Sequence, residues 1–117
     1  MTAPAACAPN FALLHESVAH HARRAPDRVA IDEGKESITY GQLGEKMEHL
    51  AGVLAAAGVA RHCRIGLYLE NGIPACIGML GALRAGCCYV PLPPSFPPER
   101  NSMVVLDSCP AAVVTTR

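Results

Sequence analysis

Hydrophobic positions follow two patterns along this chain. In some segments hydrophobic residues recur at helical spacing. The short runs between these segments are apolar and rich in residues that favour β-strands. Thr39 with Gln42 three residues later forms a capping box, and Gly58 and Gly86 suit the left-handed end of a helix. The pattern therefore predicts helices at about 11–24, 40–57, 73–85 and 98–107, with strands at 29–32, 37–39, 64–69, 87–91 and 112–115.

The first two predicted helices each have an apolar face. Asn10 is the predicted N-cap of the first helix, and Pro26 ends it. In the second helix, the apolar repeat continues up to Gly58. The residues predicted to point inward are Phe11, Leu14, Val18 and Ala22 in the first helix, and Leu43, Met47, Leu50, Val53 and Leu54 in the second.

The second half of the chain has the order β-α-β-α-β, which is typical of a parallel sheet with right-handed crossovers. The predicted fold class is therefore α/β, with this unit preceded by two helices and short strands. The helix at 73–85 is apolar on nearly every side, as expected of a helix buried in a larger α/β body. We expect residues 1–10, a Pro/Ala segment, to be a mobile tail and 11–117 to belong to one domain.

A distinctive run covers Leu83 to Leu92, reading LRAGCCYVPL, and continues from Pro93 as PPSFPPER. Gly86 ends one helix, residues 87–90 form a short strand, and the prolines that follow stop it. This order resembles a core motif of adenylate-forming enzymes, above all the adenylation domains of nonribosomal peptide synthetases, where it is close to LKAGxAYVPLDPxYPxxR. The resemblance implies an incomplete N-terminal subdomain of that fold, truncated before the phosphate-binding loop.

Two further segments are similar to the same family. ITYGQLGEKMEHLAGVLAAAGV, from Ile38, resembles LTYxELNxxANxLAxxLxxxGV, and LLHESVAHHARRAPDRVAI, from Leu13, resembles LHELFxxQAxRTPDxVAV. The motifs follow in register, and ITYGQL and PPER favour amino-acid-activating members over fatty-acyl ligases. Two positions depart from the family pattern: Pro93 replaces an aspartate, and His62–Cys63 replaces a Gly-Asp turn.

The resemblance implies an ATP-dependent ligase reaction for the complete enzyme. Such enzymes use ATP and Mg²⁺ to convert a carboxylic acid, here an amino acid, into an acyl-adenylate and pyrophosphate. The acyl group then passes to a phosphopantetheine thiol on a carrier protein. In the family, a loop with a sequence close to YTSGTTGxPKG holds the ATP phosphates. The Thr115–Thr116 pair of this chain is not that loop, because the glycines and the lysine of the loop are missing around it. We therefore assign no catalytic, cofactor-binding or metal-binding residue, and we expect the 117-residue chain alone to be inactive.

Two other functions stay open. A non-catalytic interaction module would dock with a separately encoded remainder of a synthetase or with a carrier protein, because the sheet and the helix at 73–85 need partners. A self-contained Rossmann-like binder would instead unfold in one cooperative thermal transition. We expect a poorly cooperative or aggregating species.

Charge and composition change this picture little. Ten basic and ten acidic residues balance, no basic run occurs, and nothing favours binding to nucleic acid or to an anionic membrane surface. No apolar run approaches the ~18 residues that suggest a membrane span. The opening MTAPAACAPN has no positively charged residue and no signal-peptide core, which predicts a cytoplasmic protein.

Six cysteines raise the question of a metal or redox site. They include no C-x-x-C pair, and no histidine lies at zinc-finger spacing from any of them. Without a secretory signal, an even number of cysteines does not imply a disulfide framework. Because Cys76, Cys87 and Cys88 lie in apolar helix and strand patterns, they are predicted to be buried free thiols.

The remaining candidate groups have structural explanations. Adjacent histidines on a helix face different directions and do not have metal-ligand spacing, and the serines have no histidine partner at motif spacing. Glycines inside or after a helix do not make a dinucleotide-binding turn. The groups interpreted in this way are His15, His20 and His21, Ser95 and Ser102, Gly78, Gly81 and Gly86, the packing residues Tyr40 and Tyr89, and Arg23, Arg24 and Arg28 around a helix C-terminus.

Overall fold

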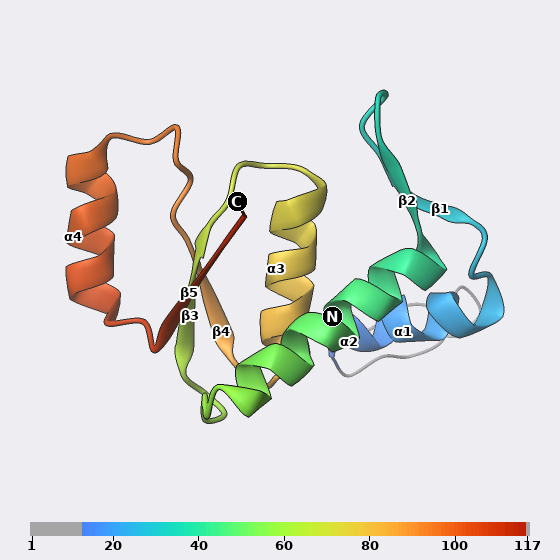
Figure 1. The fold of residues 1–117 in the computed structure, drawn as a ribbon, viewed down its shortest axis with the longest axis horizontal. Helices are drawn as coiled ribbons and strands as arrows, with labels where there is room; N and C mark the ends of the chain where they lie inside the picture. Colours follow the sequence, from blue (N-terminus) through green and yellow to red (C-terminus); the bar gives the residue numbers. More distant parts are fainter. Residues whose placement is uncertain (1–12, 117) are drawn as a thin grey trace, which may run out of the picture.

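The computed structural model describes residues 13–116, and Figure 1 shows their arrangement. Two helices and a hairpin lie on one side of a third helix, and a three-stranded sheet lies on its other side. The predicted tail at 1–10 lies outside the described residues, as do Asn10 and Phe11. The elements in chain order are α1 (Leu14–Arg24), β1 (Val29–Asp32), β2 (Ser37–Thr39), α2 (Tyr40–Ala56), β3 (Arg64–Tyr68), α3 (Ile73–Arg84), β4 (Cys88–Pro91), α4 (Pro98–Ser108) and β5 (Ala112–Thr115).

The sheet has the order β4-β3-β5, and β3 pairs in parallel with both neighbours. The chain passes from β3 through α3 to β4, and then crosses back over β3 through α4 to β5. Right-handed crossovers that run in opposite directions place their helices on opposite faces of a sheet. Accordingly, α3 and α4 lie on opposite sides of this sheet (Figure 1). The predicted α/β fold with a parallel β-α-β-α-β unit is confirmed.

The main core lies between the sheet, α3 and α2. Ile65 of β3 is fully buried, and Leu54 of α2 and Ala82 of α3 pack in the same cluster. Close helix packing depends on glycine, because a Cβ added at Gly81 would lie 2.5 Å from the side chain of Leu50. α3 is thus enclosed between α2 and the sheet, as its apolar sequence predicts.

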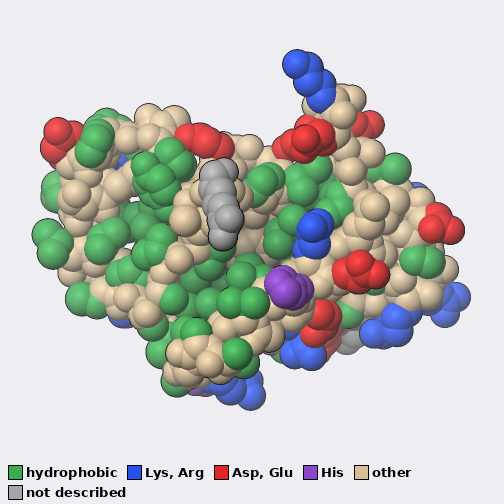
Figure 2. All heavy atoms as spheres, viewed as in Figure 1, with side chains coloured by type: hydrophobic (Ala, Val, Ile, Leu, Met, Phe, Trp, Pro, Cys, Tyr) green, Lys and Arg blue, Asp and Glu red, His purple; other side chains and the backbone are tan. Residues whose placement is uncertain are grey.

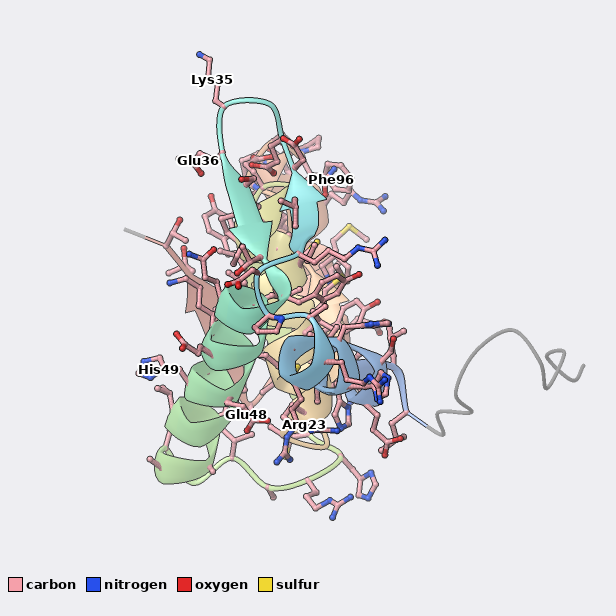
Figure 3. All side chains as sticks on the ribbon, turned by 90° about the vertical axis from the view of Figure 1, so that its right-hand side faces the viewer. Arg23, Lys35, Glu36, Glu48, His49 and Phe96 are labelled. Atoms are coloured by element: carbon pink, nitrogen blue, oxygen red, sulfur yellow. The ribbon has the colours of Figure 1, made fainter. Side chains whose placement is uncertain are left out.

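β1 and β2 form an antiparallel hairpin that leads directly into α2. Thr39 and Gln42 make the predicted capping box: the Gln42 amide donates to the Thr39 hydroxyl at 3.2 Å, and the Thr39 amide donates to Gln42 Oε1 at 3.0 Å. Lys35 lies at the outer tip of the hairpin and points away from the body (Figure 3). The Ile73 amide donates to the Glu33 carboxylate at 2.8 Å, which ties the hairpin to the start of α3.

Three predictions about the helices are wrong: the start of α1 and the burial of Leu14 and Val53. α1 begins at Leu14 rather than at residue 11, and Leu13 takes the N-cap position without a side-chain hydrogen bond. Leu14 is 68% exposed, because it precedes the part of α1 around Val18 that packs against the second core cluster. Val53 is 49% exposed, because no partner element covers this part of the apolar repeat of α2.

The other predicted boundaries agree within one residue. α2 ends at Ala56 and α3 at Arg84, and each is followed by a glycine with positive φ, Gly58 at 83° and Gly86 at 81°. His62 also adopts a positive φ, of 68°, at the position where the family pattern has a Gly-Asp turn. His62 therefore adopts a left-handed conformation that strains a residue with a Cβ.

Candidate functional site

Open parallel α/β sheets bind ligands beyond the carboxyl ends of their strands. The binding point lies where two consecutive crossover connections pass to opposite faces of the sheet. In this sheet that point lies beyond β3 and β4, and a hollow of about 280 Å³ is found there. Its wall includes two acidic residues, Glu33 and Glu70, together with Thr115 and Thr116. Because the acids repel anions and the Glu33 carboxylate is already bonded to an amide of α3, this hollow does not suit the phosphates of a nucleotide.

A larger groove of about 750 Å³ lies between α2, α3 and the end of β5. Leu50, Ile77 and Val114 make its floor apolar, whereas Glu45 and Lys46 place charges of both signs on its rim. Apolar grooves with a polar rim are typical of surfaces that another segment or protein covers. The groove thus favours contact with polypeptide over capture of a charged small molecule.

The face of the sheet toward α4 is incompletely covered. No residue of α4 is buried, and Met103 and Leu106 are 70% and 78% exposed. A hollow of about 450 Å³ lies between α4 and the sheet, and hydrophobic side chains gather over this side of the molecule, on the left of Figure 2. We call the exposed apolar set on this side the α4 surface: Tyr68, Met103, Val105, Leu106 and Val113.

The histidines singled out in the sequence lie along α1. The rings of His20 and His21 have centroids 5.3 Å apart, and the His21 ring lies 5.1 Å from that of Tyr40. Desolvation lowers the pKa of His20, and the charges of His21 and two arginines lower it further. Within residues 13–116, no group of three or more His, Cys, Asp or Glu residues could hold a metal ion. His21 and Tyr40 connect α1 to the start of α2.

The glycines of α3 serve packing. An added Cβ at Gly78 would lie 2.9 Å from the side chain of Leu69, and Gly81 lies against Leu50. As predicted, Gly78 and Gly81 lie inside a helix and Gly86 follows it, and none belongs to a strand-to-helix turn. Their amides therefore do not form a phosphate cradle.

The cysteine prediction is partly wrong. Cys87 is buried as predicted, and Cys76 is half-buried. Cys88, however, is exposed, because it opens the edge strand β4 and points to the poorly covered face toward α4. Cys109 is exposed as well, and it adopts a left-handed conformation with φ of 47° at the end of α4.

The remaining candidates lie at the surface. Arg23 and Arg24 occupy the last turn of α1, where positive charge suits the helix dipole. Ser95 in the loop before α4 and Ser102 on α4 are both exposed. Among the helices of the described chain, none is long and apolar enough to cross a membrane.

The AMP-binding enzyme family matches residues 18–117. The chain belongs to this family. It is 41% identical over 101 residues to the AMB antimetabolite synthetase AmbB of Pseudomonas aeruginosa, a match that covers 86% of this chain and 8% of AmbB. It is 38% identical over 103 residues to a linear gramicidin synthase of Brevibacillus parabrevis, covering 88% of this chain and 2% of that protein. The resemblance to adenylation domains of nonribosomal peptide synthetases is confirmed.

Solved structures of adenylate-forming enzymes share the fold of this chain. The complex of VinN with 3-methylaspartate superposes with a TM-score of 0.81 and 29% identity, over 88% of this chain and 29% of VinN. A four-domain nonribosomal peptide synthetase, AB3403, bound to AMP and glycine gives a TM-score of 0.81 and 29% identity over 89% of this chain and 8% of that one. The chain therefore spans a small share of each protein that it matches.

The described residues do not by themselves fit ATP with Mg²⁺, or a phosphopantetheine arm. They supply neither a cluster of metal-binding side chains nor a glycine-rich turn free to approach phosphate, and the hollow at the strand ends is lined by acids. Glu33 accepts a hydrogen bond from the Ile73 amide at the start of α3, and this role was not predicted from the sequence. Nothing in the sequence marks this residue, because its partner is 40 positions away.

Proposed function

We propose that residues 11–117 form the N-terminal scaffold of an amino-acid adenylation domain. The complete domain would use ATP and Mg²⁺ to activate the carboxyl group of an amino acid, release pyrophosphate, and transfer the acyl group to a phosphopantetheine thiol of a carrier protein in the cytoplasm. One observation carries the proposal: the fold superposes on 29% of VinN with a TM-score of 0.81. The complexes of AB3403, a nonribosomal peptide synthetase, with AMP and glycine, and of VinN with 3-methylaspartate, support an amino acid as the substrate.

We infer that these 117 residues alone do not turn over ATP. Gly78 and Gly81 of α3 lie against neighbouring side chains, Gly58 and Gly86 follow helix ends, and the described side chains form no metal cluster. Purified chain, tested against the twenty amino acids, should give no ATP–pyrophosphate exchange above a buffer control. Exchange that depends on one amino acid, and that survives further purification, would contradict this inference.

The second candidate, docking with the remainder of an adenylation domain, is supported by the α4 surface. Exposed apolar patches rimmed by polar residues are typical of interfaces, and α4 buries none of its residues. We propose the remainder of an adenylation domain as the occupant, because the relatives continue far beyond the matched segment.

Co-expression tests this interface. The tagged chain should co-purify with an AmbB fragment that begins directly after the matched segment. Met103→Asp combined with Leu106→Asp should abolish the complex, whereas Leu14→Asp is a matched control, because Leu14 is equally exposed on α1. Equal loss of the complex with the control variant, or no complex with the unmodified chain, would count against the docking function.

A further inference from the structure

Three cysteines meet where β3 and β4 begin. Cys63 directly precedes β3, Cys87 directly precedes β4, and Cys88 is the first residue of β4. The Cys88 amide donates a hydrogen bond of 2.9 Å to the Cys63 carbonyl, so the two segments already run side by side here. Because Arg64 pairs with Cys88, one step back along both segments places Cys63 level with Cys87.

Cys63 and Cys87 also share one face of the sheet. Both pack in the core cluster that contains Ile65, which agrees with the rule that side chains two residues apart along a strand point the same way. Cys88 points to the opposite face and is exposed. Of these three cysteines, Cys63 and Cys87 are therefore the two whose sulfur atoms lie on the same side.

The surroundings of Cys87 place the second thiol nearby. Its Sγ lies 3.5 Å from the carbonyl oxygen of Ala60, in the turn that leads to Cys63. Burial raises the pKa of the Cys87 thiol, and the neighbouring Cys63 thiol raises it further. Adjacent strands lie about 4.8 Å apart, and disulfides span Cα separations of about 4.4–6.8 Å. A bond between Cys63 and Cys87 therefore needs no large backbone movement.

We propose that Cys63 and Cys87 are a modification site that closes into a disulfide in the presence of a small-molecule disulfide such as oxidised glutathione. Cys63 is half-buried and accessible, so its thiolate attacks one sulfur of the oxidant and one small thiol leaves. The Cys87 sulfur then attacks the Cys63 sulfur, and the second small thiol leaves. Two protein thiols are oxidised, one small disulfide is reduced, and the two protons pass to the released thiols.

The bridge would hold the turn at 60–63 to the start of β4, at the amino ends of the strands. Ligands of such sheets bind at the opposite, carboxyl ends, so the bridge would stabilise the scaffold without covering that region. Closing the segment from 63 to 87 restricts the unfolded chain. We expect the thermal midpoint to rise by roughly 10 °C on oxidation. This inference does not depend on the proposed function.

The test uses the full chain with excess oxidised glutathione, blocked free thiols, tryptic digestion and mass spectrometry without reductant. We expect a link between the peptides His62–Arg64 and Ala85–Arg100. The second peptide contains both Cys87 and Cys88, so Cys88→Ser should keep the link and Cys87→Ser should lose it. Because Cys87 is buried and its replacement can unfold the chain, Cys63→Ser provides a second variant that should lose the link.

A parallel sample oxidised in guanidinium chloride controls for random pairing among the six cysteines. The native sample should be enriched in the link between Cys63 and Cys87 relative to this denatured sample. Loss of the link in Cys88→Ser, equal pairing in the native and denatured samples, or Cys63 found only as a glutathione adduct would each overturn the proposal.

Discussion

The turn before β3 shows how a single residue can keep a geometry that its side chain disfavours. His62 has a positive φ of 68°, and its amide donates to the Gly86 carbonyl at 2.8 Å. A left-handed conformation costs a residue with a Cβ roughly 1–2 kcal/mol. The backbone hydrogen bond explains why the turn persists despite this cost.

We expect His62→Gly to raise the free energy of unfolding by roughly 1 kcal/mol, because glycine adopts positive φ without steric strain. The urea midpoint of the purified variant measures this change. His49→Gly is the matched control, since His49 is exposed on α2, where glycine should lower stability by about 0.5 kcal/mol (Figure 3). A lower midpoint for His62→Gly would show that the imidazole makes a stabilising contact that outweighs the strain.

At the residue scale, the sequence predicts local chemistry better than burial. The capping box at Thr39 and the left-handed glycines at 58 and 86 depend on neighbours within a few positions, and all were predicted. Cys88 was placed wrongly in the interior, because its exposure depends on how much of the sheet α4 covers. Glu33 was missed, because its hydrogen bond forms only when the hairpin meets α3.

At the element scale, the contact between α2 and α3 depends on Gly81. A Cβ there would overlap the Leu50 side chain, so Gly81→Ala should lower the free energy of unfolding by roughly 1–3 kcal/mol. Gly52→Ala is the control on α2, where nothing lies within 4 Å of an added Cβ. Alanine in that helix should raise stability by up to about 1 kcal/mol. Equal shifts of the urea midpoint in the two variants would contradict this packing.

The hydrogen bond between Glu33 and the Ile73 amide should fix the hairpin against the main body. We expect Glu33→Ala to lower the free energy of unfolding by about 1 kcal/mol, because it leaves a first-turn amide of α3 without its acceptor. Glu36→Ala, on the same hairpin, changes charge equally and serves as the control (Figure 3). Hydrogen exchange of the Ile73 amide should quicken in the first variant alone, and unchanged exchange there would argue against the contact.

Element types and order follow from the sequence, whereas the extent of each buried face does not. The helical repeat in α2 identifies its apolar side, and Leu43, Met47 and Leu54 are buried as predicted. Val53 and Leu14 belong to the same repeats but are exposed, because the partner elements do not reach them. Hydrophobic spacing defines a direction around a helix, and tertiary packing decides how far that face is covered.

At the scale of the molecule, the described residues form a core with two uncovered apolar regions, the α4 surface and the groove beside β5. Family membership was predicted from motifs that span the helices α1 and α2 and the turns and strands around β4. Under the proposed function the same motifs are scaffold, which explains why they identify the family without identifying a catalytic residue. Coverage of 29% of VinN fits this division between scaffold and reactive groups.

A graft into AB3403 tests the scaffold role most directly. Residues 13–116 would replace the matched segment of AB3403, and glycine-dependent ATP–pyrophosphate exchange would be measured. We expect the chimera to retain exchange, because these residues supply the same fold and no reactive group. The matched segment of VinN, also 29% identical to this chain, provides a graft control. A folded chimera without exchange, alongside an active VinN graft, would contradict the scaffold role.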